Sequence, residues 1–396
     1  MEKGLNSRRR HKARALFPSR LALRGIGAVA LACLAGGTLT SAATGSLVRA
    51  AVVPLAGRAP HTTSTGASQG SCVQAGASKL TARLVAHAHE TITAIVRAGG
   101  CDIGIYVPPG ASGVVIRGAT VTGALDQGIL VQDSNAVTIE DSTVVGNLVR
   151  PDVCPLPPAK PKGPCIVDAK AVELVGSSHS VIEGNTIADN TGEGGIGVFD
   201  DGAQSPGTLG RGIPLPAMDN LVAHNVVVDN PRGCGIVIST HVVGEAVVGN
   251  RVIDNVSVGN AEGVVVADNM PHTKLVGTVV SGNVATDSVA PGIVLNSLAP
   301  FDVVSGTLVE DNVISGNGGL PPFEHLPGYV PRPTGVIVVT AGLPPSTPKG
   351  TAPPVQLGVR LVGNIISGEG WGIWSTPQNH LAITGTVDRG VAANRT

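Results

Sequence analysis

Apolar and polar positions alternate along most of the chain, and the alternation is organised into a phrase that recurs. The phrase reads VIEGNTIADN at 181–190, LVAHNVVVDN at 221–230, AVVGNRVIDN at 246–255 and TLVEDNVISGN at 307–317. Each copy is followed by a small residue and a β-branched run, such as GGIGVF, CGIVIS or EGVVVA. With the weaker copies, eight such pairs occur. One supersecondary unit is therefore repeated, and internal repetition decides the fold class.

The spacing of the phrase predicts a coil of short strands. The unit is about 23–25 residues long, its apolar positions alternate, and no helical period is present. Leu and Asn at fixed offsets also suit a leucine-rich repeat, but the L-x-x-L-x-L frame is absent. We therefore predict an all-β parallel β-helix of about eight to ten rungs, with loop insertions flanking one sheet.

Each unit is predicted to hold three strands, which in the copy at 181 span 181–184, 186–188 and 196–199. Asn185 lies at the corner between the first two strands, where a left-handed backbone conformation is expected and Asn tolerates it best after Gly. Stacked copies of this Asn can also hydrogen-bond along the axis. Two files of structural asparagines follow. The first contains Asn185, Asn225, Asn250, Asn312 and Asn364, and the second contains Asn147, Asn190, Asn230, Asn255, Asn283 and Asn317.

The N-terminal region has a different pattern. A basic leader precedes an apolar stretch at 25–43 that ends in small residues, which predicts a signal peptide over 1–43. A retained membrane anchor is the alternative, because the apolar stretch is close to the length of a membrane span. Residues 44–70, rich in Ala, Thr, Ser, Gly and Pro, predict a flexible linker. We expect a cap over 71–102, with 80–97 forming either a short amphipathic helix or an opening strand, and the β-helix over 103–396.

Composition supports this organisation and excludes some partners. Aromatic residues make up 2% of the chain and Gly 54 of its 396 residues, which suits thin, tightly coiled strands. The formal net charge is −1 at pH 7, so no nucleic-acid surface is expected. Zinc-protease, P-loop and dinucleotide motifs are absent. We expect a monomer with no cofactor, Ca²⁺ being the ion that its carboxylates would suit.

The cysteines predict two disulfides. Cys72 and Cys101 bracket the cap, and Cys154 and Cys165 bracket a Pro-rich loop, so each pair is expected to join in an oxidising compartment. Cys234 is left over at the start of a strand. We expect it to be a buried thiol, since no His or basic residue is adjacent in the sequence.

The candidate chemistry lies along the Gly-Ile strands. Four insertions, 148–167, 202–217, 318–333 and 341–354, flank these strands and predict a groove on their sheet. Equivalent positions on adjacent rungs are about 5 Å apart, so neighbouring Asp201 and His241 are the candidate acid–base pair. Asp200 and Asp268, about 10 Å apart, and Glu173 are the candidate charge or ion partners. The alternative is that these side chains only close turns.

The phrases I-x-G-N-x-I-x-x-N and G-I-x-V resemble those of right-handed parallel β-helix proteins of the pectate-lyase-like superfamily. They are most similar to the NosD-like group of carbohydrate-binding and sugar-hydrolase repeats, over residues 103–388. The resemblance implies a right-handed coil and a secreted protein that binds, degrades or modifies a polysaccharide, as a hydrolase, lyase or epimerase. A non-catalytic extracellular or cell-envelope scaffold is the alternative, since the active-site motifs of polygalacturonases, pectate lyases and alginate epimerases are absent. The membrane is an expected partner only if the N-terminal segment is retained.

Overall fold

The computed structural model describes residues 71–75, 80–147, 169–200, 215–320, 328–340 and 354–396. Within these ranges the chain forms β-strands and no helix, and consequently no helix there is long and apolar enough to cross a membrane. The predicted signal peptide and linker lie outside the described residues. The segment 80–97 contains the strand β2 (Thr81–Val85), so the opening strand is confirmed and the capping helix is wrong.

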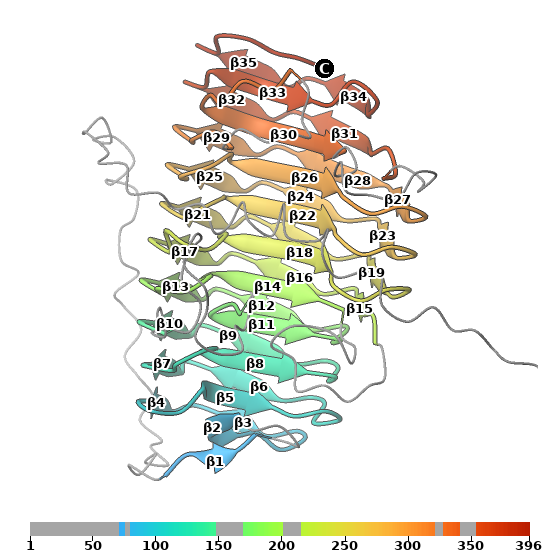
Figure 1. The fold of residues 1–396 in the computed structure, drawn as a ribbon. Helices are drawn as coiled ribbons and strands as arrows, with labels where there is room; N and C mark the ends of the chain where they lie inside the picture. Colours follow the sequence, from blue (N-terminus) through green and yellow to red (C-terminus); the bar gives the residue numbers. More distant parts are fainter. Residues whose placement is uncertain (1–70, 76–79, 148–168, 201–214, 321–327, 341–353) are drawn as a thin grey trace, which may run out of the picture.

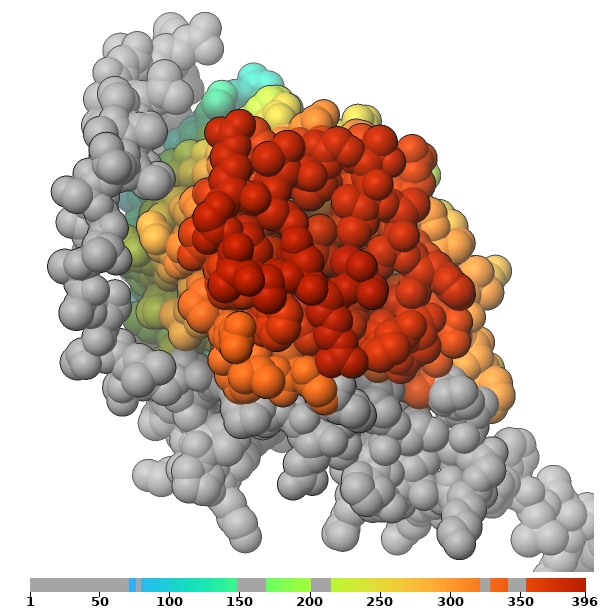
Figure 2. All heavy atoms as spheres, turned by 90° about the horizontal axis from the view of Figure 1, so that it is seen from above, coloured from blue at the N-terminus to red at the C-terminus, as the bar shows by residue number. Residues whose placement is uncertain are grey.

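The strands coil into a solenoid of three long sheets, rising from β1 at one end to β35 at the other (Figure 1). Each strand pairs in parallel with its equivalent on the next rung, as β11 does with β8 and β14; the antiparallel β1–β2 pair at the start is the exception. The predicted parallel β-helix is therefore confirmed. Figure 2 looks along the coil, and the atoms of the last rungs cover its end.

Sheet A is built from the Gly-Ile runs. Its strands are, in spatial order, β1 (Val73–Gln74), β2 (Thr81–Val85), β5 (Ile103–Val107), β8 (Ile129–Gln132), β11 (Val172–Val175), β14 (Ile196–Phe199), β18 (Ile236–Thr240), β22 (Val264–Asp268), β26 (Ile293–Ser297), β30 (Thr334–Thr340) and β33 (Trp371–Ser375).

Sheet B holds the strands before the corner asparagines. They are β3 (Thr91–Ile92), β6 (Val115–Arg117), β9 (Thr138–Glu140), β12 (Val181–Glu183), β16 (Leu221–Ala223), β20 (Arg251–Ile253), β24 (Val279–Ser281), β28 (Thr307–Glu310), β31 (Gly358–Val362) and β34 (His380–Thr384).

Sheet C holds the strands after the corner. They are β4 (Ile95–Arg97), β7 (Thr120–Thr122), β10 (Thr143–Val145), β13 (Thr186–Ala188), β17 (Val226–Val228), β21 (Val256–Val258), β25 (Val284–Thr286), β29 (Val313–Ser315), β32 (Ile365–Ser367) and β35 (Val387–Arg389).

A fourth, shorter sheet was not predicted. Sheet D contains β15 (Ala217–Met218), β19 (Ala246–Val248), β23 (Lys274–Val276) and β27 (Val303–Ser305), each lying between a sheet A strand and a sheet B strand along the chain. The middle rungs therefore have four strands rather than three.

The extra strand changes the asparagine files. The corner between sheets B and C carries a hydrogen-bonded ladder from Asn225 through Asn255 and Asn283 to Asn312. Asn250 belongs to a different ladder with Asn220, at the corner between sheets D and B. The predicted files were therefore wrong at the four-stranded rungs, because sheet D adds another copy of the phrase there. The structural role of the asparagines is confirmed, since each ladder residue is buried and bonded to a neighbouring rung.

The left-handed conformation is also displaced from its predicted position. It belongs to the residue before the ladder asparagine, with φ of 67° at Gly184, 55° at His224 and 53° at Asp254. The asparagine that follows turns its amide into the ladder instead. Gly, Asp and His at this position each tolerate the left-handed region better than other residues do.

The core fills the inside of the coil with small β-branched side chains. The central residue of each short strand points inward, as Ile182 and Ile187 do, and meets Ile196 and Val198 from sheet A. All four side chains are completely buried. Val and Ile suit this position because their branched side chains pack well on a pleated surface.

One predicted disulfide is present and one cysteine assignment is wrong. Cys72 and Cys101 form a disulfide over the first rungs, with a Cα–Cα distance of 5.5 Å. The predicted Cys154–Cys165 pair lies outside the described residues. Cys234, expected to be a free thiol, is disulfide-bonded. Sequence adjacency gave no sign of this bond, since a stacked fold brings distant segments together.

Candidate functional site

The outer face of sheet A is apolar in its middle rungs. Phe199, Val237, Val265 and Val294 point away from the core and form a second hydrophobic cluster, as the alternation predicts. These side chains are at most 6% exposed, so they are packed rather than open to solvent. Polar groups on this side of the coil therefore concentrate at the two ends of the strands.

Asp200 and His241 meet where β14 and β18 end. The pairing of Phe199 with Ser239 sets the register, and the His241 N–H donates to Asp200 Oδ1 over 2.5 Å. The imidazole stacks on the Phe199 ring, with centroids 4.2 Å apart and planes 15° apart. Both residues are buried. The candidate partner Asp201 lies outside the described residues, so its pairing with His241 stays a prediction.

Asp268 sits in a buried nest of hydroxyls at the end of β22. Its carboxylate accepts hydrogen bonds from the hydroxyls of Thr240, Thr273 and Ser297, at 3.2, 2.6 and 3.3 Å. Burial raises the pKa of Asp268, and these bonds oppose the rise. Because Asp268 pairs with Thr240 and Asp200 lies next to Phe199, the two aspartates are two rungs apart, as predicted.

Asp302 was missed by the sequence analysis, and it completes a carboxyl pair with Asp268. It follows β26 in the next turn, accepts the Thr273 N–H at 3.0 Å, and is 9% exposed. Burial, together with the hydrogen bond and the charge of Asp268, raises the pKa of Asp302 to about 8. Two carboxyl groups this close share one proton near neutral pH. Asp302 and Thr273 occupy equivalent positions on adjacent rungs, because Lys274 pairs with Val303 in sheet D. The sequence analysis did not align these two residues, since it did not predict sheet D.

Glu173 belongs to a different cluster, nearer the opposite ends of the sheet A strands. Its Oε2 accepts from Gln127 Nε2 at 3.2 Å, and the adjacent Lys170 forms a buried ion pair with Glu193 at 3.0 Å. Glu262 lies in the same cluster, close to Cys234 and Lys170. Burial raises its pKa to about 7, although the charge of Lys170 acts in the opposite direction. The structure therefore does not bring Glu173 to the aspartates.

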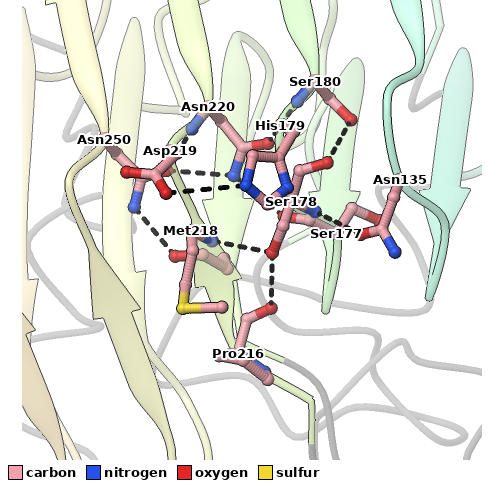
Figure 3. Close-up of polar contacts among 11 residues, drawn as sticks. Asn135, Ser177, Ser178, His179, Ser180, Pro216, Met218, Asp219, Asn220 and Asn250 are labelled. Carbon is pink, nitrogen blue, oxygen red and sulfur yellow. Dashed lines mark hydrogen bonds and ion pairs between the residues drawn. The ribbon is translucent and has the colours of Figure 1, made fainter.

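The corner formed by Ser178 and the described residues from 216 is held by side-chain-to-backbone hydrogen bonds. Figure 3 shows the Ser178 hydroxyl donating to the Pro216 carbonyl and accepting the Met218 N–H. The imidazole of His179 lies 3.6 Å from the Asp219 carboxylate, with both side chains more than 60% exposed. An exposed ion pair of this kind contributes little stability. These contacts therefore shape the corner and do not form a recessed site.

Both tryptophans and one of the two tyrosines lie at the C-terminal rungs. Both tryptophans of the chain lie on β33, where Trp374 is buried and meets Tyr329 edge-on at 4.9 Å. The Arg332 guanidinium lies 5.1 Å from the centre of the Trp371 ring, and Arg395 lies 5.6 Å from that of Trp374. Trp371 is partly exposed and Arg332 is exposed. This edge of sheet A therefore offers a cation beside an aromatic ring.

The described part of the chain contains no preformed metal site. No group of three or more His, Cys, Asp or Glu side chains is arranged there to hold an ion. Ca²⁺ at the candidate carboxylates therefore stays a prediction that includes Asp201.

Comparison with known proteins supports the fold. The model of the right handed beta helix region matches residues 91–280. With the coil seen above, the chain is a right-handed parallel β-helix protein, as its repeats predict. No curated protein sequence matches the chain.

Solved structures are similar to the chain at low identity. The exopolygalacturonase of Thermotoga maritima is 12% identical over 73% of this chain and 55% of its own, with a TM-score of 0.48. The mannuronan C-5 epimerase AlgE4 A-module of Azotobacter vinelandii is 14% identical over 79% and 80%, at 0.45. PfbA, a surface adhesin of Streptococcus pneumoniae, is 10% identical over 80% and 84%, at 0.42. The chain thus spans little more than half of the exopolygalacturonase, and these similarities concern fold alone.

Proposed function

We propose that the protein is a secreted β-helix protein that binds a polysaccharide and transfers protons to it through the Asp268–Asp302 carboxyl pair. The observation that carries the proposal is geometric: Thr273 holds two buried carboxyl groups together, its hydroxyl donating to Asp268 at 2.6 Å and its N–H to Asp302 at 3.0 Å. Burial and the neighbouring Asp268 raise the pKa of Asp302, which favours a proton on this pair. A carboxylic acid that stays protonated near pH 7 is what a general acid requires. Asp268 is completely buried at the end of β22, and Asp302, in the turn after β26, is 9% exposed, so a substrate would reach the pair through Asp302.

A second carboxylate stands at a useful distance. Asp200 is two rungs from Asp268, which corresponds to about 10 Å. Inverting glycosidases separate their acid and base by roughly 6.5–9.5 Å to admit a water molecule. The spacing of about 10 Å lies just above this range and far above the roughly 5–5.5 Å of retaining enzymes, so the proposed reaction is hydrolysis with inversion. His241 and the predicted Asp201 flank Asp200 and are proposed as its supports, while Glu173 is proposed as a charge partner in the other cluster.

The experiment is a screen of neutral and acidic polysaccharides for new reducing ends and for unsaturated products. Asp302→Asn is expected to lower turnover at least a hundredfold while the variant still binds. Asp254→Asn, at a turn of the sheet B–C corner, is the matched control and should retain activity. Asp201→Asn and His241→Ala test the supports. Full activity of Asp302→Asn on a substrate that the unaltered protein cleaves would refute the acid role.

A non-catalytic glycan-binding scaffold is the second candidate, and the pairing of Arg332 with Trp371 favours it. A guanidinium over an indole suits an anionic sugar, which can stack on the ring and pair with the cation. Under this function Trp371→Ala abolishes binding of an acidic glycan, and Asp302→Asn changes nothing.

The location is proposed to be extracellular. The Cys72–Cys101 disulfide agrees with an oxidising compartment. The alternative is a protein anchored at the envelope by its N-terminal segment. Fractionation, with mass spectrometry of the mature N-terminus, separates the two. A monomer remains the prediction for size-exclusion chromatography.

A further inference from the structure

Three successive turns lie stacked beside the carboxyl pair. They follow β18, β22 and β26 and are kept in register by two backbone hydrogen bonds. The Gly244 N–H donates to the Pro271 carbonyl at 3.2 Å, and the His272 N–H donates to the Pro300 carbonyl at 3.4 Å. Gly244, His272 and Phe301 therefore occupy equivalent positions. All three adopt the left-handed conformation, with φ of 88°, 64° and 69°.

Phe301 does not suit this position on structural grounds. A left-handed residue is normally Gly, Asn or Asp, and a bulky side chain there is an outlier. Among the described residues, the other non-glycine residues with positive φ are Asp, His or Ala. The Phe301 side chain is 59% exposed, so burial of its ring contributes little to offset the strain. Strain at a position with no packing role points to a function.

The ring of Phe301 is held as part of a flat surface. It stacks on the His272 imidazole, with centroids 5.0 Å apart and planes 6° apart, and His272 is also exposed. Phe301 directly precedes Asp302, and His272 directly precedes Thr273, whose hydroxyl donates to Asp268. Both rings are therefore fixed one residue away from the carboxyl pair or its hydrogen-bond partner.

We propose that Phe301 and His272 form a stacking platform that holds a neutral pyranose ring of a polysaccharide over Asp302. Aromatic faces bind the C–H face of a sugar by desolvation and dispersion, and the exposed apolar ring supplies such a face. A pair sharing one proton keeps one negative charge, which disfavours a uronate and selects a neutral sugar. The inference rests on the proposed function and adds the ligand class and the residues that hold it.

The test is the substitution Phe301→Gly, which removes the ring and relieves the backbone strain. The probes are hexasaccharides of β-1,4-glucose, α-1,4-glucose, β-1,4-xylose and β-1,4-mannose, with hexagalacturonate as the acidic comparison. We expect affinity for the bound neutral sugar to fall about tenfold, equivalent to about 1.4 kcal/mol. The urea midpoint of unfolding should rise, because Gly is the natural residue for this φ. Phe301→Trp should retain binding. Ile95→Ala is the control, since Ile95 is also 59% exposed but lies on sheet C.

The outcomes separate this inference from the proposed function. Unchanged affinity in Phe301→Gly, or a lower unfolding midpoint, overturns the platform even where Asp302→Asn shows that the acid pair is active. Lost affinity in Phe301→Gly, with no turnover by the unaltered protein, supports the platform and refutes the catalytic role. Preference for hexagalacturonate refutes the neutral ligand class. Absence of binding to every probe refutes the platform, and the proposed function is then decided by the polysaccharide screen with Asp302→Asn.

Discussion

Asparagine ladders are expected to carry a large share of the stability of each rung, and Asn283 offers the sharpest test. Its amide accepts from the Asn255 N–H and Nδ2 at 3.0 and 2.9 Å. Its two Nδ2 hydrogens are shared among three acceptors, the Val252 and Ser281 carbonyls and Asn312 Oδ1, at 2.9, 3.0 and 3.0 Å. These five bonds join three successive rungs at one buried corner.

The substitution Asn283→Thr keeps a polar side chain but cannot span both neighbouring rungs. A net hydrogen bond contributes about 1 kcal/mol, and a buried group left without a partner costs about 1–3 kcal/mol. Thr can replace one or two of the five bonds. We therefore expect a loss of about 3–5 kcal/mol in the free energy of unfolding, since the Asn255 N–H loses its acceptor.

The opposite substitution, from Thr to Asn, can be made at Thr278 in the neighbouring corner. Thr278 follows Asn250 in the ladder at the corner of sheets D and B, and its buried hydroxyl has no hydrogen-bond partner. Thr278→Asn should let the ladder continue by a rung, accepting the Asn250 N–H as Asn250 accepts that of Asn220. The expected gain is about 1–2 kcal/mol.

Urea unfolding followed by circular dichroism measures both variants, with hydrogen exchange at the Asn255 and Asn250 amides as the local readout. Exchange should quicken at Asn255 in the first variant and slow at Asn250 in the second. The reasoning fails if Asn283→Thr costs less than about 1 kcal/mol, or if Thr278→Asn destabilises the protein. Either result would mean that packing, not amide bonding, holds the corners.

Three further predictions address ionisation, backbone and crosslinks. The pKa of Asp302 is raised to about 8 in the folded protein, so the free energy of unfolding of the unaltered protein should fall as pH rises from about 4 to about 8. Urea titrations at successive pH values should show the free energy of unfolding of Asp302→Asn rising relative to that of the unaltered protein over the same window. Gly195→Ala should cost several kcal/mol in urea unfolding, since an added Cβ would lie 2.3 Å from the Gly235 carbonyl oxygen, whereas Gly110→Ala, also left-handed but with open space around it, should cost about 1 kcal/mol. Non-reducing peptide mapping should find Cys234 in a disulfide, and its labelling by a maleimide without reduction would contradict this.

The sequence predicted strands well and corners less well, for a physical reason. The expected strands 186–188 and 196–199 match β13 and β14, because period-two alternation is set by burial on one face. Asn250 was placed in the wrong ladder because Gly249 precedes it, just as Gly184 precedes Asn185 and Gly282 precedes Asn283 at the other corner. Only the number of strands per rung separates these corners, and short strands such as β19 have no periodicity of their own.

In the candidate site, too, the residues on strands could be placed from the sequence and the residues in turns could not. Asp200 and Asp268 directly follow or end strands, so their two-rung separation could be worked out from the repeat. Asp302 lies inside a turn, where no alternation sets its position, and its role depends on a hydrogen bond across rungs. Turn residues therefore needed the three-dimensional stacking, while strand residues did not.

The asparagine ladder and the strained turn at Phe301 lie on the same rung. Phe301 adopts a conformation that costs about 1–2 kcal/mol, and it lies on the rung whose corner is fixed by Asn312. Asn312 bonds both to Asn283 before it and to Asn364 after it, so that rung is held from both sides. A strained residue persists only where the surrounding structure over-determines it. Weakening the ladder with Asn312→Thr should therefore let Phe301 relax and make Phe301→Gly less stabilising than it is in the unaltered protein. A double-mutant cycle measures that coupling, and strict additivity of the two changes would show that ladder and turn are independent.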